Sequence, residues 1–225
     1  MKCKVGVVLS GCGFLDGSEI HEAVLTLLAL DELDVEAICM APRGPQRGVV
    51  DHATQADVAG SRDMLVEAAR IARGRIRDLA TVRAADVDAL VLPGGYGAAK
   101  NLCDFAAKGA QATPHPEVAR LLREVHAARK PIGGWCIAPA LLAAVFGPSA
   151  HPLLTVGDDA GTARELVAMG ARHQDCAVEA CVVDRDQRIV TAPAYMFSAR
   201  IGAVAAGIRA GCREVVAMAR AGGGA

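Results

Sequence analysis

The chain has 225 residues, of which 52% are hydrophobic and only 3% aromatic, enough for one substantial core built mostly from alanine, valine and leucine. Lysine and arginine together number 24, and aspartate and glutamate 25, so there is no electrostatic basis for binding nucleic acid or an acidic membrane surface. We therefore expect a single domain over residues 1–221 that binds neither, followed by a flexible glycine-rich tail over residues 222–225.

Eight cysteines are spread along the chain without a C-x-x-C pair, so the sequence predicts neither a zinc ribbon nor a dithiol redox site, and we expect no metal and no cofactor. The chain passes from Met1-Lys2-Cys3-Lys4 straight into a short apolar run, so we expect no secretory signal, and no later apolar stretch is long enough to span a bilayer. Free thiols are typical of a reducing compartment, and a cytoplasmic location is the expectation.

The N-terminal segment reads as a buried strand over residues 5–9, a glycine-rich turn and an apolar helix over residues 23–30, which Ser18 can cap. The first turn of this helix carries Glu19, His21 and Glu22. Favourable interaction of the acids with the helix dipole is explanation enough for their position. The Gly-x-Gly after the strand lacks the third glycine of a dinucleotide-binding motif, so dinucleotide binding is disfavoured.

Two further buried strands are predicted over residues 35–40 and 88–92. The polar loop over residues 43–60 is too long to be a simple connection in a compact domain, and we expect a flap or a small hairpin there. A helix over residues 64–72, capped by Ser61, completes this part of the chain.

The third strand runs into the turn Pro93-Gly94-Gly95-Tyr96. Consecutive glycines after a strand allow backbone N–H groups to point at a ligand, which is how an oxyanion hole is built from main chain. A phosphate loop is excluded because the Gly-Lys-Ser/Thr ending is absent. A plain tight turn is the alternative.

Residues 132–142 form the most informative stretch, a short apolar run that ends at Cys136 and is followed by a helix opened by Pro139. This strand, tight turn and helix resemble a nucleophile elbow, which presents a side chain above the end of the sheet. A cysteine there lies at the positive end of the helix, so we expect an ionised thiol. A buried structural cysteine is the alternative.

The remaining elements are predicted as a strand over residues 153–156, a helix over 160–169, two strands over 176–184 and 189–192, and a last helix over 198–220. Alternating strands and helices predict an α/β three-layer sandwich with a mostly parallel sheet. Its functional residues are expected at the carboxyl ends of the strands.

These features together resemble the class I glutamine amidotransferase-like superfamily, more closely its PfpI branch, and within that the ElbB-like (enhancing lycopene biosynthesis) family. The matching motifs cover nearly the whole chain and include Leu9-Ser10-Gly11-Cys12-Gly13, Asp16-Gly17-Ser18-Glu19-Ile20-His21-Glu22-Ala23, Pro93-Gly94-Gly95-Tyr96-Gly97-Ala98-Ala99-Lys100-Asn101-Leu102, Cys136-Ile137-Ala138-Pro139 and Thr191-Ala192-Pro193-Ala194-Tyr195-Met196.

The resemblance implies a flavodoxin-like sandwich, usually a homodimer, in which Cys136 is the nucleophile and a carboxylate of the first helix lies beside it. We prefer Glu22 to Glu19 because it lies nearer the helix body. The implied activity is that of a cofactor-independent glyoxalase, a lyase or hydratase of the glyoxalase III type. It would convert a small aldehyde, glyoxal, to glycolate, and the family is linked to isoprenoid biosynthesis.

In this mechanism the oxyanion hole consists of the N–H groups of Gly95 and Ile137. Further expected pocket residues are Glu19, His21, Gly94, Lys100 and Asn101.

One departure from the superfamily is Ile137, which stands where amidotransferases and peptidase-like relatives often have a histidine. Glutaminase or peptidase activity would need a substitute such as His126 or His173. The other alternative is a regulatory protein in which Cys136 senses oxidants without robust catalysis.

Overall fold

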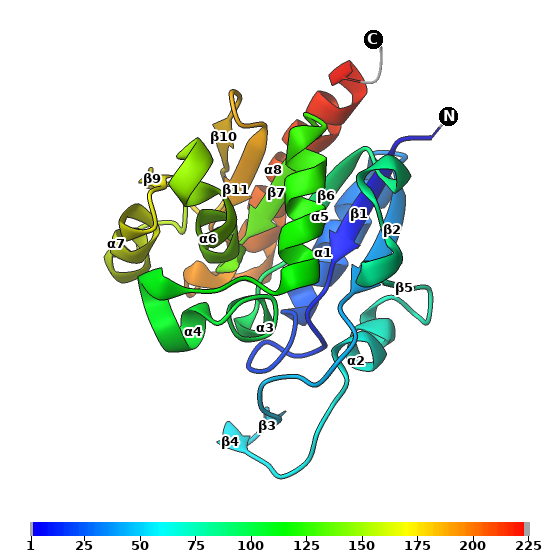
Figure 1. The fold of residues 1–225 in the computed structure, drawn as a ribbon, viewed down its shortest axis with the longest axis vertical. Coiled ribbons are helices and arrows are strands. Elements are labelled where there is room, and N and C mark those ends of the chain that lie inside the picture. The colour runs from blue at the N-terminus through cyan, green and yellow to red at the C-terminus, as the bar shows by residue number, and fades with distance from the viewer. Residues whose placement is uncertain (1, 223–225) are drawn as a thin grey trace.

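The computed structural model describes residues 2–222. Its centre is a seven-stranded sheet in the order β10-β11-β7-β6-β1-β2-β5 (Figure 1), parallel throughout except that β10 runs antiparallel to β11. The strands are β1 (Lys4–Val8), β2 (Glu36–Ala41), β5 (Arg77–Asp78), β6 (Ala89–Leu92), β7 (Ile132–Trp135), β10 (Val182–Asp184) and β11 (Ile189–Ala192). This confirms the predicted α/β fold with a mostly parallel sheet.

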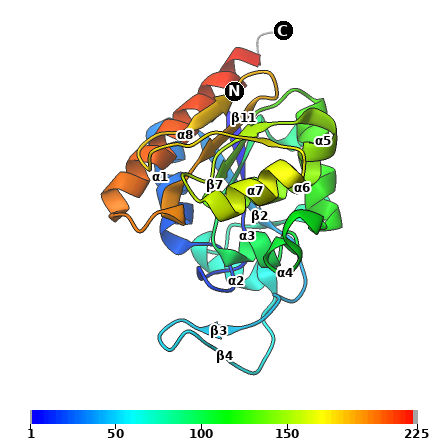
Figure 2. The ribbon, with the colours of Figure 1, turned by 90° about the vertical axis from the view of Figure 1, so that its left-hand side faces the viewer.

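Helices cover both faces of the sheet, as Figures 1 and 2 show. The eight α-helices of the described residues are α1 (Ile20–Glu32), α2 (Met64–Ile71), α3 (Tyr96–Lys100), α4 (Phe105–Lys108), α5 (Pro116–Ala127), α6 (Ala138–Ala150), α7 (Ala160–Ala168) and α8 (Ile201–Gly222). Successive strand residues point to opposite faces, so β6 contributes Leu90 and Leu92 to the core under α5 and α6, and Ala89 and Val91 to the core under α1, α2 and α8.

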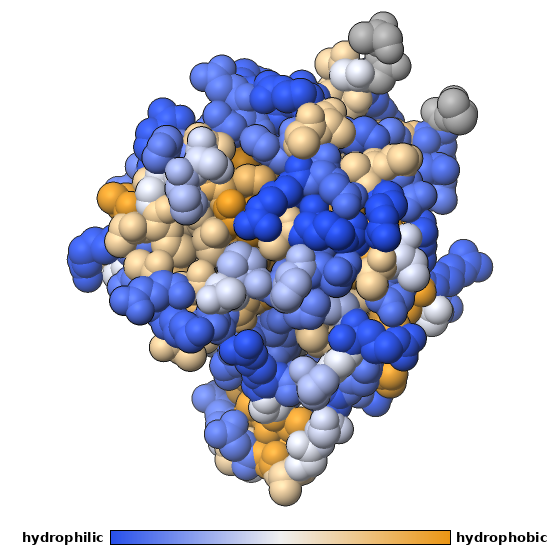
Figure 3. Space-filling model, in the orientation of Figure 1, coloured by the Kyte–Doolittle hydropathy of each residue, from blue (hydrophilic) through white to orange (hydrophobic). Residues whose placement is uncertain are grey.

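The long polar loop after β2 contains the expected hairpin, formed by β3 (Val50–Asp51) and β4 (Ala56–Asp57). It projects from the body of the molecule, at the bottom of Figures 1 and 2. Figure 3 shows a largely hydrophilic face with apolar residues gathered on this projection, where Val58 is exposed. The loop is therefore an arm rather than a lid closed over the sheet.

Both predicted helix caps are corrected by the structure. Helix α1 is capped by Glu19, whose Oε2 accepts a hydrogen bond of 2.6 Å from the N–H of Glu22, while the Ser18 hydroxyl is buried and accepts from the N–H of Ser10. Helix α2 is capped by Asp63 rather than Ser61. In each case an acidic side chain nearer the helix competes successfully for the free N–H groups.

The C-terminal third also departs from expectation. The strand predicted over residues 153–156 is reduced to β8 (Leu153–Leu154), which pairs with β9 (Arg172–His173) outside the main sheet. Of residues 176–184, only the last three form β10. Helix α8 extends to Gly222, which the sequence places in the tail, and the rest of the predicted tail lies outside the described residues.

Candidate active site

Cys136 lies directly after β7 and two residues before α6, with a positive φ of 56°. Such a backbone conformation is costly for a residue with a side chain and persists only where the surroundings hold it. The Cys136 N–H donates to the carbonyl of Ala192 at 3.0 Å, which anchors the turn to β11. The strand, strained turn and helix give the geometry of a nucleophile elbow.

Glu22 projects from the first turn of α1 and its side chain is completely buried. Its Oε2 accepts a hydrogen bond from the Gly94 N–H at 2.8 Å, and its Oε1 accepts one from the Tyr195 N–H at 3.2 Å. Its carboxyl lies beside the Cys136 thiol, close enough for each group to change the pKa of the other. Three distant segments of the chain therefore hold one carboxyl group against one sulfur.

Gly94 makes this approach sterically feasible. A Cβ atom at this position would lie 2.5 Å from the Cβ of Cys136 and 2.9 Å from Oε2 of Glu22, closer than real Cβ contacts. Gly95 has a φ of 90°, and a Cβ there would lie 2.3 Å from the backbone nitrogen of Glu19. The Gly-Gly turn therefore allows close packing of Gly94 against Cys136 and Glu22, and of Gly95 against the backbone before α1.

Burial is the main influence on the pKa values of Glu22 and Cys136. Burial, and secondly the charge of Glu19, raises the pKa of Glu22 from 4.5 to about 7. Burial, and secondly the charge of Glu22, raises the pKa of the Cys136 thiol well above its usual value, although N–H groups of Gly95 and Ile137 act in the opposite direction. The expectation of an ionised resting thiol is thus corrected: burial and the facing Glu22 carboxyl outweigh the N–H groups that favour the thiolate.

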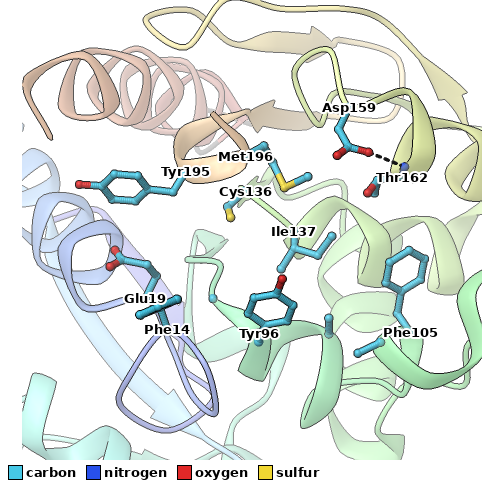
Figure 4. Close-up of a pocket in the computed structure, with 13 residues that line it drawn as sticks. Phe14, Glu19, Tyr96, Phe105, Cys136, Ile137, Asp159, Thr162, Tyr195 and Met196 are labelled. Carbon is cyan, nitrogen blue, oxygen red and sulfur yellow. Dashed lines mark hydrogen bonds between the residues drawn. The ribbon is translucent and has the colours of Figure 1, made fainter. Parts of the chain in front are cut away.

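The Cys136 sulfur opens into a cavity of about 390 Å³, and the residue retains 8% exposure. The cavity walls are mainly aromatic and aliphatic, as Figure 4 shows, with two carboxylate side chains among them. The lining residues are Phe14, Glu19, Gly95, Tyr96, Ala99, Phe105, Ala106, Cys136, Ile137, Asp159, Thr162, Tyr195 and Met196.

Of the other expected pocket residues, Glu19 lines the cavity, and His21 lies beside it, with its Nδ1 3.0 Å from the Tyr195 hydroxyl. Lys100 and Asn101 do not line the cavity. The Lys100 ammonium donates to the Leu15 carbonyl at 3.1 Å. The buried amide of Asn101 donates to the carbonyls of Ser10 and Asp16, so both residues hold the turn after β1 in place.

The sequence reasoning missed several cavity residues because nothing local marks them. Phe14, Phe105, Asp159 and Thr162 come from loops and helix ends that the fold brings to the same edge of the sheet. Tyr195 could have been found, since it lies in a motif of the ElbB-like resemblance. Its N–H contact with Glu22 joins residues 173 positions apart and depends on the tertiary fold.

No histidine lines the cavity in the described part of the chain. Nε2 of His126 lies 3.1 Å from Oε1 of Gln187, and Nε2 of His173 accepts from the Val156 N–H. Within residues 2–222 no group of three or more histidine, cysteine, aspartate or glutamate side chains is arranged to hold a metal ion, and no helix is long and apolar enough to cross a membrane.

Comparisons with known proteins agree with this architecture. No protein-family model matches the chain. It is 43% identical over 225 residues to the human protein named glutamine amidotransferase-like class 1 domain-containing protein 3, mitochondrial, an alignment that covers 96% of this chain and 83% of that protein. The ES1 protein homolog, mitochondrial, of Rattus norvegicus is 41% identical over 227 residues, covering 96% of this chain and 84% of the rat protein.

Solved structures extend the comparison. A crystal structure of an isoprenoid biosynthesis protein with an amidotransferase-like domain from Ehrlichia chaffeensis is 39% identical, with a TM-score of 0.92, and covers 96% of this chain and 99% of that one. Drosophila melanogaster DJ-1beta is 20% identical with a TM-score of 0.56 over 98% and 97% of the two chains, which is a likeness of fold alone. The elbow, the layered sheet and these relatives together identify the chain as a member of the class 1 glutamine amidotransferase-like family that includes the ES1 proteins.

Proposed function

We propose that the protein is a cofactor-independent glyoxalase, closest in kind to ElbB-like proteins, that converts glyoxal and water to glycolate. The observation that carries this proposal is the adjacent pair of the Cys136 thiol and the buried Glu22 carboxyl at the base of a cavity. A nucleophile in contact with a carboxyl group whose pKa is about 7 has what addition to an aldehyde and a subsequent proton shift require.

In the first step the Cys136 sulfur adds to one aldehyde carbon while its proton passes to Glu22. The carbonyl oxygen becomes an alkoxide, which the N–H groups of Gly95 and Ile137 stabilise. In the free protein these N–H groups already favour the negatively charged form of the Cys136 sulfur, which supports such a role for them. Return of the proton from Glu22 to the alkoxide gives a neutral hemithioacetal and restores the carboxylate.

The carboxylate of Glu22 then removes the hydrogen from the carbon bonded to sulfur, and the electron pair forms an enediolate with the second carbon. Glu22 returns that proton to the second carbon, and the hydroxyl proton on the first carbon moves to the second oxygen. The first carbon is oxidised to a thioester and the second is reduced to an alcohol. Water cleaves the thioester, releasing glycolate and the thiol.

The test is turnover of glyoxal by matched variants. Cys136→Ser and Glu22→Gln should each reduce glycolate formation by at least about a thousandfold, because each removes a group that acts in the reaction. Cys176→Ser, at a half-buried free thiol, and Glu32→Gln, at an exposed acid of the same helix, are the controls and should retain wild-type rates. Unchanged turnover in either site variant, with its fold intact, refutes the mechanism.

An oxidant sensor centred on Cys136 is the second candidate, favoured by the carboxyl group beside the sulfur. The raised pKa of the thiol argues against it, because peroxide reacts with the thiolate. Selective oxidation of Cys136 by mild peroxide, together with negligible aldehyde turnover, would favour the sensor. Glutaminase or peptidase activity lacks a histidine at the cavity among the described residues.

A role in isoprenoid biosynthesis is supported by the name of the Ehrlichia chaffeensis relative. A homodimer remains part of the proposal, to be measured by sedimentation. The cytoplasmic location is also a proposal, and the names of the human and rat relatives describe mitochondrial proteins instead.

A further inference from the structure

The cavity is far larger than glyoxal requires. One water molecule takes about 30 Å³ of liquid volume, so a molecule with four heavy atoms fills on the order of a third of 390 Å³. The volume lies within the range of sites that enclose ligands of considerably more than four atoms. A substrate that fills this cavity therefore carries a substantial group beyond its two reacting carbons.

The walls indicate the chemistry of that group. Phe105, Ile137 and Met196 lie on the side of Cys136 that faces α7, and Tyr96 lies below them in Figure 4. Aromatic and sulfur-containing side chains bind flat apolar groups through burial and ring contacts. This half of the cavity fits an aryl or branched alkyl group.

The charges at the cavity have one sign. Glu19 and Asp159 line it on opposite sides of Cys136 in the view of Figure 4, and no lysine or arginine is among the lining residues that the structure describes. Asp159 is exposed, and one of its oxygens accepts from the Thr162 N–H at 2.6 Å. The nearby Lys100 ammonium donates to a carbonyl and lies 5.4 Å from the centre of the Tyr96 ring, outside the cavity wall. Two carboxylates without a lining cation disfavour an anionic ligand.

We propose that the substrates this site accepts best are 2-oxoaldehydes whose ketone carbon bears an aryl or bulky alkyl group that is neutral or positively charged. This inference rests on the proposed function and narrows its substrate class. It assigns Asp159, which the proposed chemistry does not use, as a residue that determines specificity against anions.

The same reaction sequence serves these substrates. The Cys136 sulfur adds to the aldehyde carbon, Glu22 moves the hydrogen of that carbon to the former ketone carbon, and water opens the thioester. The aldehyde carbon is oxidised to a carboxylate and the ketone is reduced to a secondary alcohol, giving a 2-hydroxy acid. The product gains a negative charge between Glu19 and Asp159, so the charges that disfavour anionic substrates also favour product release.

The test compares four substrates: glyoxal, phenylglyoxal, and the 4-carboxy and 4-aminomethyl derivatives of phenylglyoxal. For each we measure kcat/KM and divide it by the compound's rate of addition to a free thiol, so that intrinsic reactivity is removed from the comparison. We expect this normalised kcat/KM to be about tenfold or more higher for phenylglyoxal than for glyoxal, because the ring is buried against apolar walls. The normalised kcat/KM of the carboxy derivative should be about tenfold lower than that of phenylglyoxal, and that of the aminomethyl derivative should equal or exceed the value for phenylglyoxal. Asp159→Asn should lower the ratio of this normalised kcat/KM between the aminomethyl and the carboxy derivative by about threefold. Asp158→Asn, at the neighbouring acid outside the cavity wall, should leave that ratio unchanged.

A binding measurement separates this inference from the proposed reaction. The Cys136→Ala variant is titrated with acetophenone, 4-acetylbenzoate and 4-(aminomethyl)acetophenone, which need no turnover. If the three bind in the expected order but no 2-oxoaldehyde is converted, the proposed reaction fails and the ligand preference stands. If 2-oxoaldehydes are converted but the carboxy compounds bind and react as well as the neutral ones, or if none of the three binds, the inference is overturned.

Discussion

Replacing Glu22 with glutamine should make the folded protein more stable at alkaline pH, although it removes a group proposed to act in the reaction. The carboxyl is completely buried, and burial raises its pKa from 4.5 to about 7. A buried acid with a raised pKa favours folding fully below pH 4.5, where it is protonated in both states. That contribution is lost as the pH rises from 4.5 through about 7, because the folded protein must then hold a desolvated charge.

The magnitude follows from the two pKa values. Their difference of about 2.5 corresponds to about 3 kcal/mol of folding free energy lost above pH 7. Glutamine is neutral at every pH, but its amide can accept only one of the two bonds that Gly94 and Tyr195 donate, which costs about 1 kcal/mol. We therefore expect Glu22→Gln to be about 2 kcal/mol more stable than the wild type at pH 8, and about 1 kcal/mol less stable at pH 4.

The assay is urea unfolding of both proteins at pH 4, 6 and 8, monitored by far-ultraviolet circular dichroism. The control is Glu32→Gln, which removes an exposed acid paired with Arg209 on the same helix and should show no such gain at pH 8. A stability difference between Glu22→Gln and the wild type that does not change with pH, or a loss at pH 8, would refute the assignment of a buried, costly carboxylate.

Three further predictions concern the same group of residues. Gly94→Ala should lower glyoxal turnover by at least about a hundredfold, measured as glycolate formed, because its Cβ would push Cys136 away from Glu22; a rate near that of the wild type would contradict the close approach. In Glu22→Gln, the pH midpoint for alkylation of Cys136 by iodoacetamide, followed by peptide mass spectrometry, should fall below that of the wild type, because the neighbouring negative charge that raises the pKa of the thiol is gone; an unchanged or higher midpoint would exclude this coupling. Trp135→Phe should cost about 2 kcal/mol or more in urea unfolding, because the indole N–H donates to the buried Thr26 hydroxyl at 3.0 Å and the smaller ring leaves a cavity at a completely buried site; Thr26→Val is the matched partner, and the double variant should lose less stability than the sum of the two single losses.

The elbow was predictable because its signal is local. A short apolar run, a cysteine among small residues and a helix opened by Pro139 lie within eleven consecutive residues, and their backbone preferences alone specify strand, turn and helix. The Gly-Gly turn after β6 was predictable for the same reason. Parallel strands then place both turns at the same edge of the sheet, as their alternation with helices implies.

The sign of the cysteine's pKa change was not predictable from these residues. The helix N-terminus that favours a thiolate is visible in the sequence, whereas the depth at which α1 buries Glu22 and Cys136 together depends on the packing of three segments. Desolvation is a property of that packing, and it exceeds the effect of the N–H groups of Gly95 and Ile137 that favour the thiolate.

Strand and helix order, the nucleophile's turn and the acids at the start of α1 were thus determined by short stretches of sequence, because backbone geometry and hydrophobic periodicity act over a few residues. Only the tertiary structure decided that Glu22 reaches the sulfur while Glu19 caps the helix and lines the cavity, and that Lys100 and Asn101 support a loop instead. Those outcomes depend on which residues distant in sequence become neighbours in space, and on how much water their packing excludes.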